Sequence, residues 1–248
     1  KKHIKLIEHL HNNCPWLKKI GIKSLAFLYA GIKADKILTV SDSIEKEYVF
    51  SKYIRKKIIC IGNPINTQEI LDKIKGLKVE KKYDICCVAR LTEQKNPFKF
   101  IEIIKNLTKT NKNIKAIWVG DGELKDEVNE KIKAEELEKN IRLVGFQKNP
   151  YIYMSDSKVF LLTSDWEGFG LVAVEALTLG VPCVVSNVGG LVEIVNDKCG
   201  KLCTLNNEYI IEIKKLLSDK KYYEKKSNNA LAQSNHLNNI TKYISKIN

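Results

Sequence analysis

The stretch SDWEGFGLVAVEALTLGVPCVVSNVGGLVEIV, residues 164–195, decides the fold of this chain. It follows the apolar run VFLLTS (159–164), which is typical of a buried strand, and it turns through a glycine-bearing loop into an apolar helix. A second strand and the turn Gly189-Gly190 come next. A strand, a glycine turn and a helix N-terminus form an anion site together, because the first helical N–H groups are unpaired and the dipole is positive there. The stretch therefore predicts a site for a nucleotide diphosphate.

Outward from this stretch, short apolar runs alternate with helical patterns, which is the rhythm of a parallel sheet. Strands are expected within residues 4–13, 36–41, 56–64, 83–91, 114–120, 141–146, 159–164, 182–186 and 200–205. Helices are expected over residues 24–34, 43–53, 97–110, 121–140, 149–157, 170–179 and 191–195, and from 207 onward. The fold class is therefore predicted to be α/β.

The polar, lysine-rich segment 66–82 interrupts this rhythm, and we place the domain junction there. Residues 67–235 then form a complete doubly wound, Rossmann-like unit with a parallel sheet. Residues 1–66 contribute only three strands, and a freestanding sheet of that size, covered on both faces, is marginally stable. We therefore expect residues 1–66 to be the C-terminal part of a domain whose N-terminal half is missing from this chain.

The composition narrows the class of protein. The chain has 248 residues, and nothing in it approaches eighteen consecutive apolar residues, so no transmembrane helix is expected. The basic N-terminus is broken by charge and does not read as a signal peptide. The formal charge of +13 is concentrated in the first sixty-odd residues. Nucleic acid, an anionic membrane surface and acidic substrates are candidate partners, and a lysine-biased composition without a specific partner is the plain alternative.

The seven cysteines are an odd number, and four of them lie in expected strands: Cys60, Cys86, Cys87 and Cys183. This placement predicts reduced, buried thiols in a cytosolic protein. Cys199 and Cys203 are four residues apart, with no Cys or His pair nearby to complete a zinc site. We therefore expect no metal.

Ligands of an open parallel sheet bind beyond the carboxyl ends of its strands, where this sequence has polar and glycine-rich turns. Arg90 closes the strand YDICCVAR, and Lys95 follows one turn later, just before a helix. A planar guanidinium and a point charge beside a helix N-terminus suit a diphosphate. A pair of surface cations is the alternative interpretation.

Two glutamates bracket the expected anion site. Glu167 precedes the helix, and Glu175 lies about five residues inside it, roughly 7–8 Å along the axis. Carboxylates do not bind phosphate but can accept hydrogen bonds from hydroxyls on either side of it, ribose at one end and sugar at the other. Glu175 has apolar neighbours on both sides, and a buried carboxylate without a partner is costly. One solvated loop acid and one buried helix acid remain the alternative.

With these motifs in this order, the chain resembles a retaining glycosyltransferase of family 4, within the glycosyl transferases group 1, whose GT-B fold has two facing Rossmann-like domains. The family's two glutamates separated by seven residues are matched in EGFGLVAVE, and VARLTEQKN is similar to the segment that holds the donor diphosphate. VGDGEL and VGFQKNPYIYMSDSKVFLLTS match in order and spacing. ADKILTVSDS and IICIGNPINT resemble the end of the family's first domain.

The resemblance implies roles for individual residues. Arg90 and Lys95 would neutralise the diphosphate as the sugar–phosphate bond breaks. Glu167 would hold hydroxyls of the donor sugar and Glu175 the ribose. Such enzymes need no bound metal. The remaining donor-binding positions implied are the loop residues Gly168, Phe169, Gly170 and Leu171, the base-side residues Gly145, Phe146 and Gln147, and Asn63.

The chain also departs from the family's pattern. The glycine-rich turn that normally opens the first domain does not precede Lys1. His9 and His11 follow the first strand, where related enzymes often carry acceptor-side residues; they either line the cleft or are loop histidines with no defined task. Residues 236–248 are similar to the terminal helix that packs back on the first domain.

The expected function is transfer of a sugar from a UDP- or GDP-linked donor to a glycan or lipid-linked acceptor, with retention, in synthesis of bacterial lipopolysaccharide or capsule. The expected location is cytoplasmic, peripheral on the inner face of the membrane. The alternative is a truncated, non-catalytic fragment that binds nucleotide sugars. Nucleic-acid binding is supported by charge alone. A dehydrogenase is disfavoured because residues 120–122 lack the third glycine of the dinucleotide fingerprint.

Overall fold

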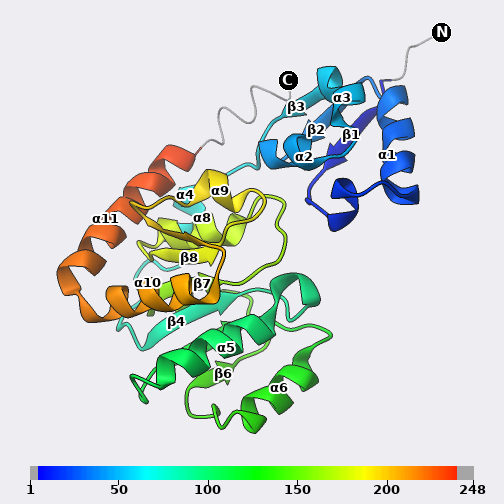
Figure 1. Cartoon of the computed structure of the whole chain (residues 1–248). Coiled ribbons are helices and arrows are strands. Elements are labelled where there is room, and N and C mark those ends of the chain that lie inside the picture. The colour runs from blue at the N-terminus through cyan, green and yellow to red at the C-terminus, as the bar shows by residue number, and fades with distance from the viewer. Residues whose placement is uncertain (1–4, 239–248) are drawn as a thin grey trace.

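The computed structural model describes residues 5–238, which form two parallel sheets with helices packed around each (Figure 1). Both sheets are entirely parallel in the described residues, as the alternation of strands and helices predicts. None of the helices in this part of the chain is long and apolar enough to cross a membrane.

The first sheet has the order β1-β2-β3, from β1 (Ile7–Leu10), β2 (Lys36–Thr39) and β3 (Ile58–Cys60). Its helices are α1 (Ile22–Lys33), α2 (Asp42–Glu47) and α3 (Ser51–Ile54), with 3₁₀ turns at Pro15–Lys18 and Arg55–Lys57. The single helix expected over residues 43–53 is wrong, because the chain is extended at Tyr48 (φ −72°, ψ 120°). The Tyr48 hydroxyl donates to the carbonyl of Ser24 at 2.7 Å, and this buried anchor interrupts the helical pattern.

The second sheet has the order β6-β5-β4-β7-β8-β9. Its strands are β4 (Tyr83–Val88), β5 (Ala116–Val119), β6 (Ile141–Leu143), β7 (Ser157–Leu162), β8 (Cys183–Ser186) and β9 (Gly200–Cys203). The chain builds outward from β4 in one direction and then returns to build outward from β7 in the other. The doubly wound arrangement is therefore confirmed, and its topological switch point lies between β4 and β7.

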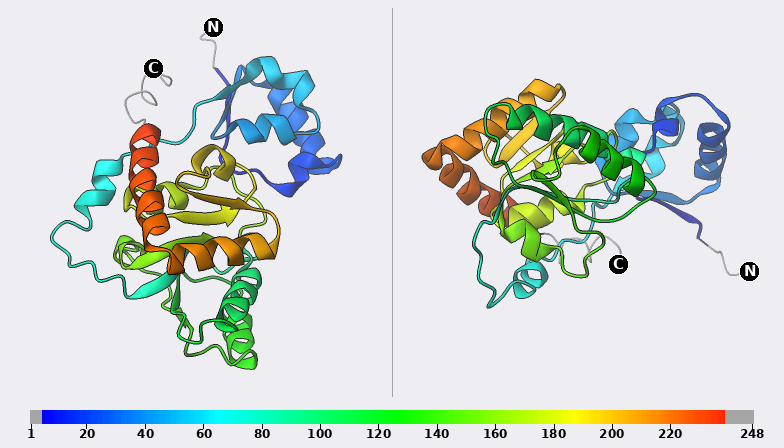
Figure 2. Two further views of the ribbon diagram at one scale, coloured as in Figure 1. Left: turned by 60° about the vertical axis from the view of Figure 1, so that its left-hand side comes forward. Right: turned by 90° about the horizontal axis from the view of Figure 1, so that it is seen from below.

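Helices cover both faces of this sheet, with α5, α6 and α10 on one side and α7 and α8 on the other (Figure 2). The bounds are α5 (Pro97–Thr108), α6 (Lys125–Ala134), α7 (Tyr151–Ser155), α8 (Leu171–Thr178), α9 (Leu191–Ile194), α10 (Asn206–Ser218) and α11 (Lys220–Leu237). The expected helix 121–140 is shorter than predicted. Gly122 packs on the backbone of Leu91 before it begins, and Glu136 adopts a left-handed φ of 55° just after it ends.

The junction segment contains a short helix, α4 (Thr67–Asp72), which the polar sequence did not predict. The Asn66 side chain caps it by accepting from the Glu69 N–H at 3.4 Å. Ile70 is buried, and α4 packs against α8 of the second sheet. At the other end, α11 packs on α8 through the Thr178–Ser234 hydroxyl pair at 2.7 Å. Apart from the last turn of α11, the expected terminal helix at 236–248 lies outside the described residues.

The seven cysteines are free thiols. Cys86, Cys87 and Cys183 are fully buried in the central strands, as expected. Burial raises the pKa of the Cys86 thiol to about 12, so this thiol is protonated at neutral pH. Cys60 is only half-buried, contrary to the prediction, because β3 is an edge strand of the first sheet.

Candidate functional site

The carboxyl ends of β4 and β7 place two loops side by side at the switch point. The Asp165 N–H donates to the carbonyl of Gln94 at 2.9 Å, and the Gln94 side-chain amide donates to the carbonyl of Trp166 at 2.9 Å. The Thr163 hydroxyl donates to the carbonyls of Lys95 and Asn96 at 3.0 Å. These bonds join segments about seventy residues apart in sequence and hold the predicted cations and carboxylates at one edge.

Lys95 and Glu167 form an ion pair in this edge, with Lys95 Nζ 2.5 Å from Glu167 Oε1. Their side chains are 14% and 7% exposed. The Ser164 hydroxyl donates to the same carboxylate oxygen at 2.7 Å. A nearly buried pair needs such additional hydrogen bonds to offset desolvation. Lys95 is therefore not one of a pair of surface cations.

Arg90 differs from Lys95 although both follow β4. Its side chain is exposed, and within residues 5–238 it forms no hydrogen bond or ion pair. The guanidinium is free to bind an anion without first breaking another contact. The structure therefore brings Lys95 and Glu167 into direct contact and leaves Arg90 at the rim.

Glu175 is the fifth residue of α8, as the sequence predicts. The Tyr151 hydroxyl donates to its Oε1 at 3.2 Å. Burial raises the pKa of Glu175, while the Tyr151 hydrogen bond and the charge of Lys73 act in the opposite direction. Lys73 Nζ lies 5.3 Å from the centroid of the Tyr151 ring. This half-buried acid thus has a partner, although the Tyr151 hydrogen bond and the Lys73 charge do not fully offset its desolvation.

Glu175 lies in the wall of a pocket of about 410 Å³, between α8, α7 and the segment that joins the two sheets. Its lining residues are Pro64, Ile65, Asn66, Glu69, Ile70, Tyr151, Leu171, Val174 and Glu175. Apolar walls with a few polar groups are typical of small-molecule sites. Leu171, which also lines the pocket, is the first residue of α8, and the first turn of a helix presents unpaired N–H groups.

Three glycines let the backbone pack closely around the β7 loop. Gly170 has a φ of +95°, which L side chains rarely adopt, and a Cβ on it would meet Leu191. A Cβ on Gly189 would lie 1.8 Å from the carbonyl oxygen of Glu167. A Cβ on Gly168 would lie 2.1 Å from the carbonyl oxygen of His11. The loop is therefore packed between the Gly189-Gly190 turn and the first sheet's own loop.

The structure places His9 and His11 with their ring centroids 3.9 Å apart. Burial and the neighbouring His11 lower the pKa of His9, so it stays neutral at physiological pH. His11 contacts the β7 loop through its main chain, opposite Gly168. In the same loop, the buried side-chain oxygen of Asn12 has no hydrogen-bond partner among the described residues. The loop reaches the site, but the main chain of His11 rather than its ring makes the contact with Gly168.

The remaining predicted residues lie just after β6 and β3. Gly145, with a φ of +68°, bridges to Gly120, and Phe146 is 79% exposed. Gln147 is held by the carbonyl of Val144 and by the Tyr153 hydroxyl. Asn63 is half-buried just beyond β3, in the segment that joins the sheets.

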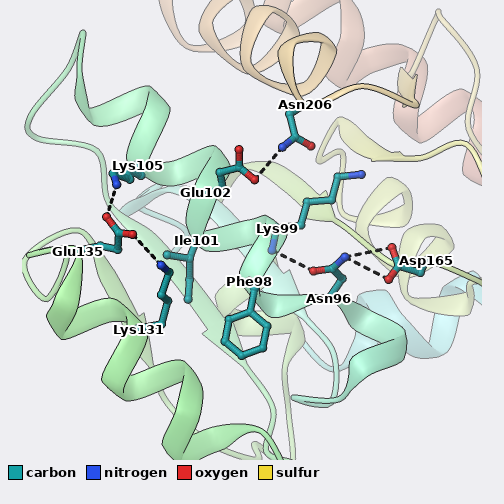
Figure 3. Close-up of a pocket in the computed structure, with 10 residues that line it drawn as sticks. All are labelled: Asn96, Phe98, Lys99, Ile101, Glu102, Lys105, Lys131, Glu135, Asp165 and Asn206. Atoms are coloured by element: carbon teal, nitrogen blue, oxygen red, sulfur yellow. Dashed lines mark hydrogen bonds and ion pairs between the residues drawn. The ribbon is translucent and has the colours of Figure 1, made fainter.

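A larger pocket, of about 560 Å³, lies between α5, α6 and the start of α10 (Figure 3). Its charged side chains all have partners: Glu135 pairs with Lys105 and Lys131, Glu102 with the Asn206 amide, Asp165 with the Asn96 amide, and Lys99 with the Tyr209 hydroxyl. None of the predicted site residues lines it. Its polar groups are already satisfied locally, so we assign the chemistry to the β4–β7 edge. No group of three or more His, Cys, Asp or Glu within residues 5–238 is arranged to hold a metal ion.

Sequence reasoning missed the partners of the key residues. Tyr151 is separated from Glu175 by β7 and the loop after it, so no local pattern links the two. Ser164 lies three residues before Glu167, and its position in the turn after β7 was the available signal. The sequence predicts Glu193 only as part of a short apolar helix, yet its carboxylate accepts a hydrogen bond from Ser41, which lies beside the first sheet.

Comparison with known proteins gives consistent matches. The family model described as "Glycosyl transferases group 1" matches residues 68–233. The amylovoran biosynthesis glycosyltransferase AmsD of Erwinia amylovora is 32% identical over 167 residues, 66% of this chain and 47% of that protein. The UDP-Gal:alpha-D-GlcNAc-diphosphoundecaprenol alpha-1,3-galactosyltransferase of Escherichia coli is 33% identical over 188 residues, 74% of this chain and 48% of that protein. The chain thus spans about half the length of these curated relatives.

Among solved structures, Anabaena HepE in complex with UDP and glucose superposes with a TM-score of 0.84. The match covers 98% of this chain and 70% of that chain, at 21% sequence identity. At this identity the likeness shows the fold, and the fold is of the GT-B type that the sequence resemblance implies. The assignment to the retaining family 4 stays a prediction.

Proposed function

The chain belongs to the glycosyl transferases group 1 family, and on this premise we propose that it binds a nucleoside-diphosphate sugar and takes part in transfer of the sugar to a glycan or lipid-linked acceptor. The observation that carries the proposal is the Lys95–Glu167 ion pair, which joins the loops after β4 and β7 next to the N-terminus of α8. This edge combines one buried cation, one free cation and unpaired helical N–H groups. Those are the groups that a diphosphate requires.

In the proposed complex the diphosphate lies at the N-terminus of α8. Lys95 and Arg90 neutralise it, and the N–H groups near Phe169, Gly170 and Leu171 donate to its oxygens. Glu175 accepts from the ribose hydroxyls in the 410 Å³ pocket. Glu167 accepts from the sugar hydroxyls on the other side. The base rests against Gly145–Gln147, with Asn63 near the junction.

The proposed reaction breaks the bond between the anomeric carbon of the sugar and the diphosphate oxygen, which leaves with the electron pair. The acceptor hydroxyl forms the new bond to that carbon, and its proton passes to the leaving diphosphate. Lys95 and Arg90 contribute by stabilising the charge that develops on the leaving diphosphate, which is the electrostatic part of transition-state stabilisation. We propose that the anomeric configuration is retained and that no metal is needed, in line with the resemblance to family 4.

The acceptor is proposed to be lipid-linked, and the exposed face of α1 supports this. Ile22, Leu25, Tyr29 and Ile32 are 48–88% exposed and lie on one side of the helix. No acidic residue occurs from Lys18 to Lys33, which includes four lysines. An apolar helix face flanked by lysines suits the surface of an anionic membrane. The named E. coli relative acts on a diphosphoundecaprenol-linked sugar, and we propose a cytoplasmic enzyme that works at the membrane surface.

A binding-only role is the second candidate, because the groups at the β4–β7 edge and in the 410 Å³ pocket would bind a nucleotide sugar whether or not transfer follows. One experiment separates the two. Isothermal titration with UDP, GDP and uridine tests donor binding, and release of UDP from UDP-glucose and UDP-galactose tests turnover. Binding with turnover supports the transferase. Binding of UDP without turnover of either UDP-sugar, with an undecaprenyl-diphosphate acceptor present, supports the binding-only role. Absence of binding to both diphosphates contradicts the proposal.

A further inference from the structure

We infer that Glu193 is a positioning residue that holds the first sheet and its helices, the first sheet's unit, against the β7 loop. The inference rests on the proposed function of that loop. Glu193 lies in α9, on the second sheet's side. Its Oε1 accepts from the Ser41 hydroxyl at 2.7 Å and from the Asp42 N–H at 3.0 Å. Both donors belong to the first sheet's unit, at the start of α2.

On the first sheet's side of this contact, each hydrogen bond can be assigned a donor and an acceptor. Ser41 is buried, and its oxygen also accepts from the Ser43 N–H at 3.0 Å, which caps α2. Since the single hydroxyl proton of Ser41 goes to Glu193, the Ser43 hydroxyl donates to Ser41 across 2.6 Å. Glu193 is itself an exposed residue, and its carboxylate ends a chain of hydrogen bonds that runs through the buried side chains of Ser41 and Ser43. Asp42 contributes the next free N–H of the helix, an orphan donor that needs an external acceptor.

On the second side, Glu193 is tied to the donor loop through backbone packing. Helix α9 begins directly after Gly189-Gly190. The Gly190 N–H donates to the carbonyl of Gly168 at 3.1 Å, and Gly189 lies against Glu167. No side chain separates these backbones. A displacement of α9 therefore displaces the β7 loop with it.

A second contact between the two units involves the same loop, where the His11 main chain lies against Gly168. The β7 loop thus contacts both the loop after β1 and the Gly189-Gly190 turn, which precedes the helix that carries Glu193. The Glu193 hydrogen bonds lock this arrangement, which brings the acceptor-side unit and the donor loop together. We assign Glu193 to setting the distance between the two units and not to binding the donor.

The test compares Glu193→Ala, Glu193→Gln and the neighbouring control Val192→Ala, whose side chain is 44% exposed. Hydrogen exchange of peptides covering residues 9–13 and 41–47 reports on the contact between the two units. Titration with UDP reports on the donor site. Glu193→Ala should accelerate exchange in both peptides by about tenfold or more, since two hydrogen bonds are lost. Glu193→Gln keeps an acceptor oxygen and should restore most of the protection. UDP affinity should stay within about twofold in all three variants.

Unchanged exchange in Glu193→Ala would overturn the inference, and so would a loss of UDP affinity equal to the change in exchange, because Glu193 would then belong to the donor site. If the unmodified chain does not bind UDP, only the proposed function is contradicted. The exchange measurement still tests the contact that Glu193 makes between the two units. As a second variant, Ser41→Ala should add little to exchange at residues 9–13 in the Glu193→Ala background. Additive effects of the two changes would show that the two residues act independently.

Discussion

Lys95 Nζ lies 2.5 Å from Glu167 Oε1, and this contact joins the loops that follow β4 and β7, the strands between which the sheet reverses its winding. Both side chains are nearly buried, so removal of one partner leaves the other charged in a poorly solvated place. We expect Lys95→Met to lower the free energy of unfolding by about 2–4 kcal/mol. Urea denaturation measures this. The double variant Lys95→Met/Glu167→Gln should recover much of the loss; equal instability in both would argue that the lysine stem, not the charge pair, matters.

Arg90→Gln should leave stability within about 0.5 kcal/mol of the unmodified chain, because the exposed guanidinium has no partner within residues 5–238. It should weaken UDP binding about tenfold or more, while uridine binding changes little. Titration calorimetry with the two ligands gives the comparison. Equal losses for UDP and uridine would remove Arg90 from the diphosphate site. Arg142, on β6, offers a matched control substitution.

Glu175→Gln should raise thermal stability and weaken ligand binding. A carboxyl whose pKa is raised by folding takes up its proton more readily in the folded state. Stability of the unmodified chain should therefore fall as pH rises from the ordinary pKa of 4.5 to the raised value, and stay lower above it. The amide has no such cost, so Glu175→Gln should raise Tm by about 2–4 °C at pH 7 for each kcal/mol recovered.

Below about pH 4 the Tm difference between Glu175→Gln and the unmodified chain should vanish, because Glu175 is then protonated in both the folded and unfolded states. UDP affinity of the variant should fall at pH 7, since a ribose hydroxyl loses a charged acceptor. Thermal melts from about pH 3 to pH 8, with and without UDP, test both parts. Unchanged UDP affinity would refute the ribose role and leave the stability prediction standing.

Gly168→Ala should disturb the seam between the two units, because the added methyl would lie 2.1 Å from the carbonyl oxygen of His11. We expect a cost of about 1–3 kcal/mol, typical of overpacking, and faster hydrogen exchange at residues 9–13. Gly21→Ser is the control: nothing lies within 4 Å of a Cβ at Gly21, and serine is a good helix N-cap. If Gly168→Ala changes neither the stability nor the hydrogen exchange at residues 9–13, the two units separate readily.

Tyr29→Glu and Ile22→Glu should each reduce binding to vesicles that contain phosphatidylglycerol, because a charge on the apolar face of α1 opposes burial in the headgroup region. Co-sedimentation at low and high salt measures this, and lysine-dependent binding should weaken with salt. Glu127→Lys, on the exposed surface of α6, provides a control that changes charge elsewhere. If the α1 variants bind as the unmodified chain does, the face is covered by protein rather than by membrane.

Much of the second sheet could be predicted from local sequence, because its central strands are continuous apolar runs and its helices have clear start signals. Pro97 after Asn96 marked the start of α5, and Asn96 caps it in the structure with a φ of 46°. The break at Tyr48 and the helix α4 could not be predicted, because they depend on a hydroxyl bonded to Ser24 and on the packing of Ile70. The periodicity of apolar residues does not reveal contacts between residues that are distant in sequence.

The sequence by itself determined the parallel sheet, the order of its loops and the positions of Arg90, Lys95, Glu167 and Glu175, because each depends on neighbours within about ten residues. Only the tertiary structure decided that Lys95 pairs with Glu167 while Arg90 stays free, that Tyr151 contacts Glu175, and that Glu193 bonds to Ser41. These pairs are 24 to 152 residues apart. They form because the parallel strands end at a common edge and glycines allow the backbones there to touch.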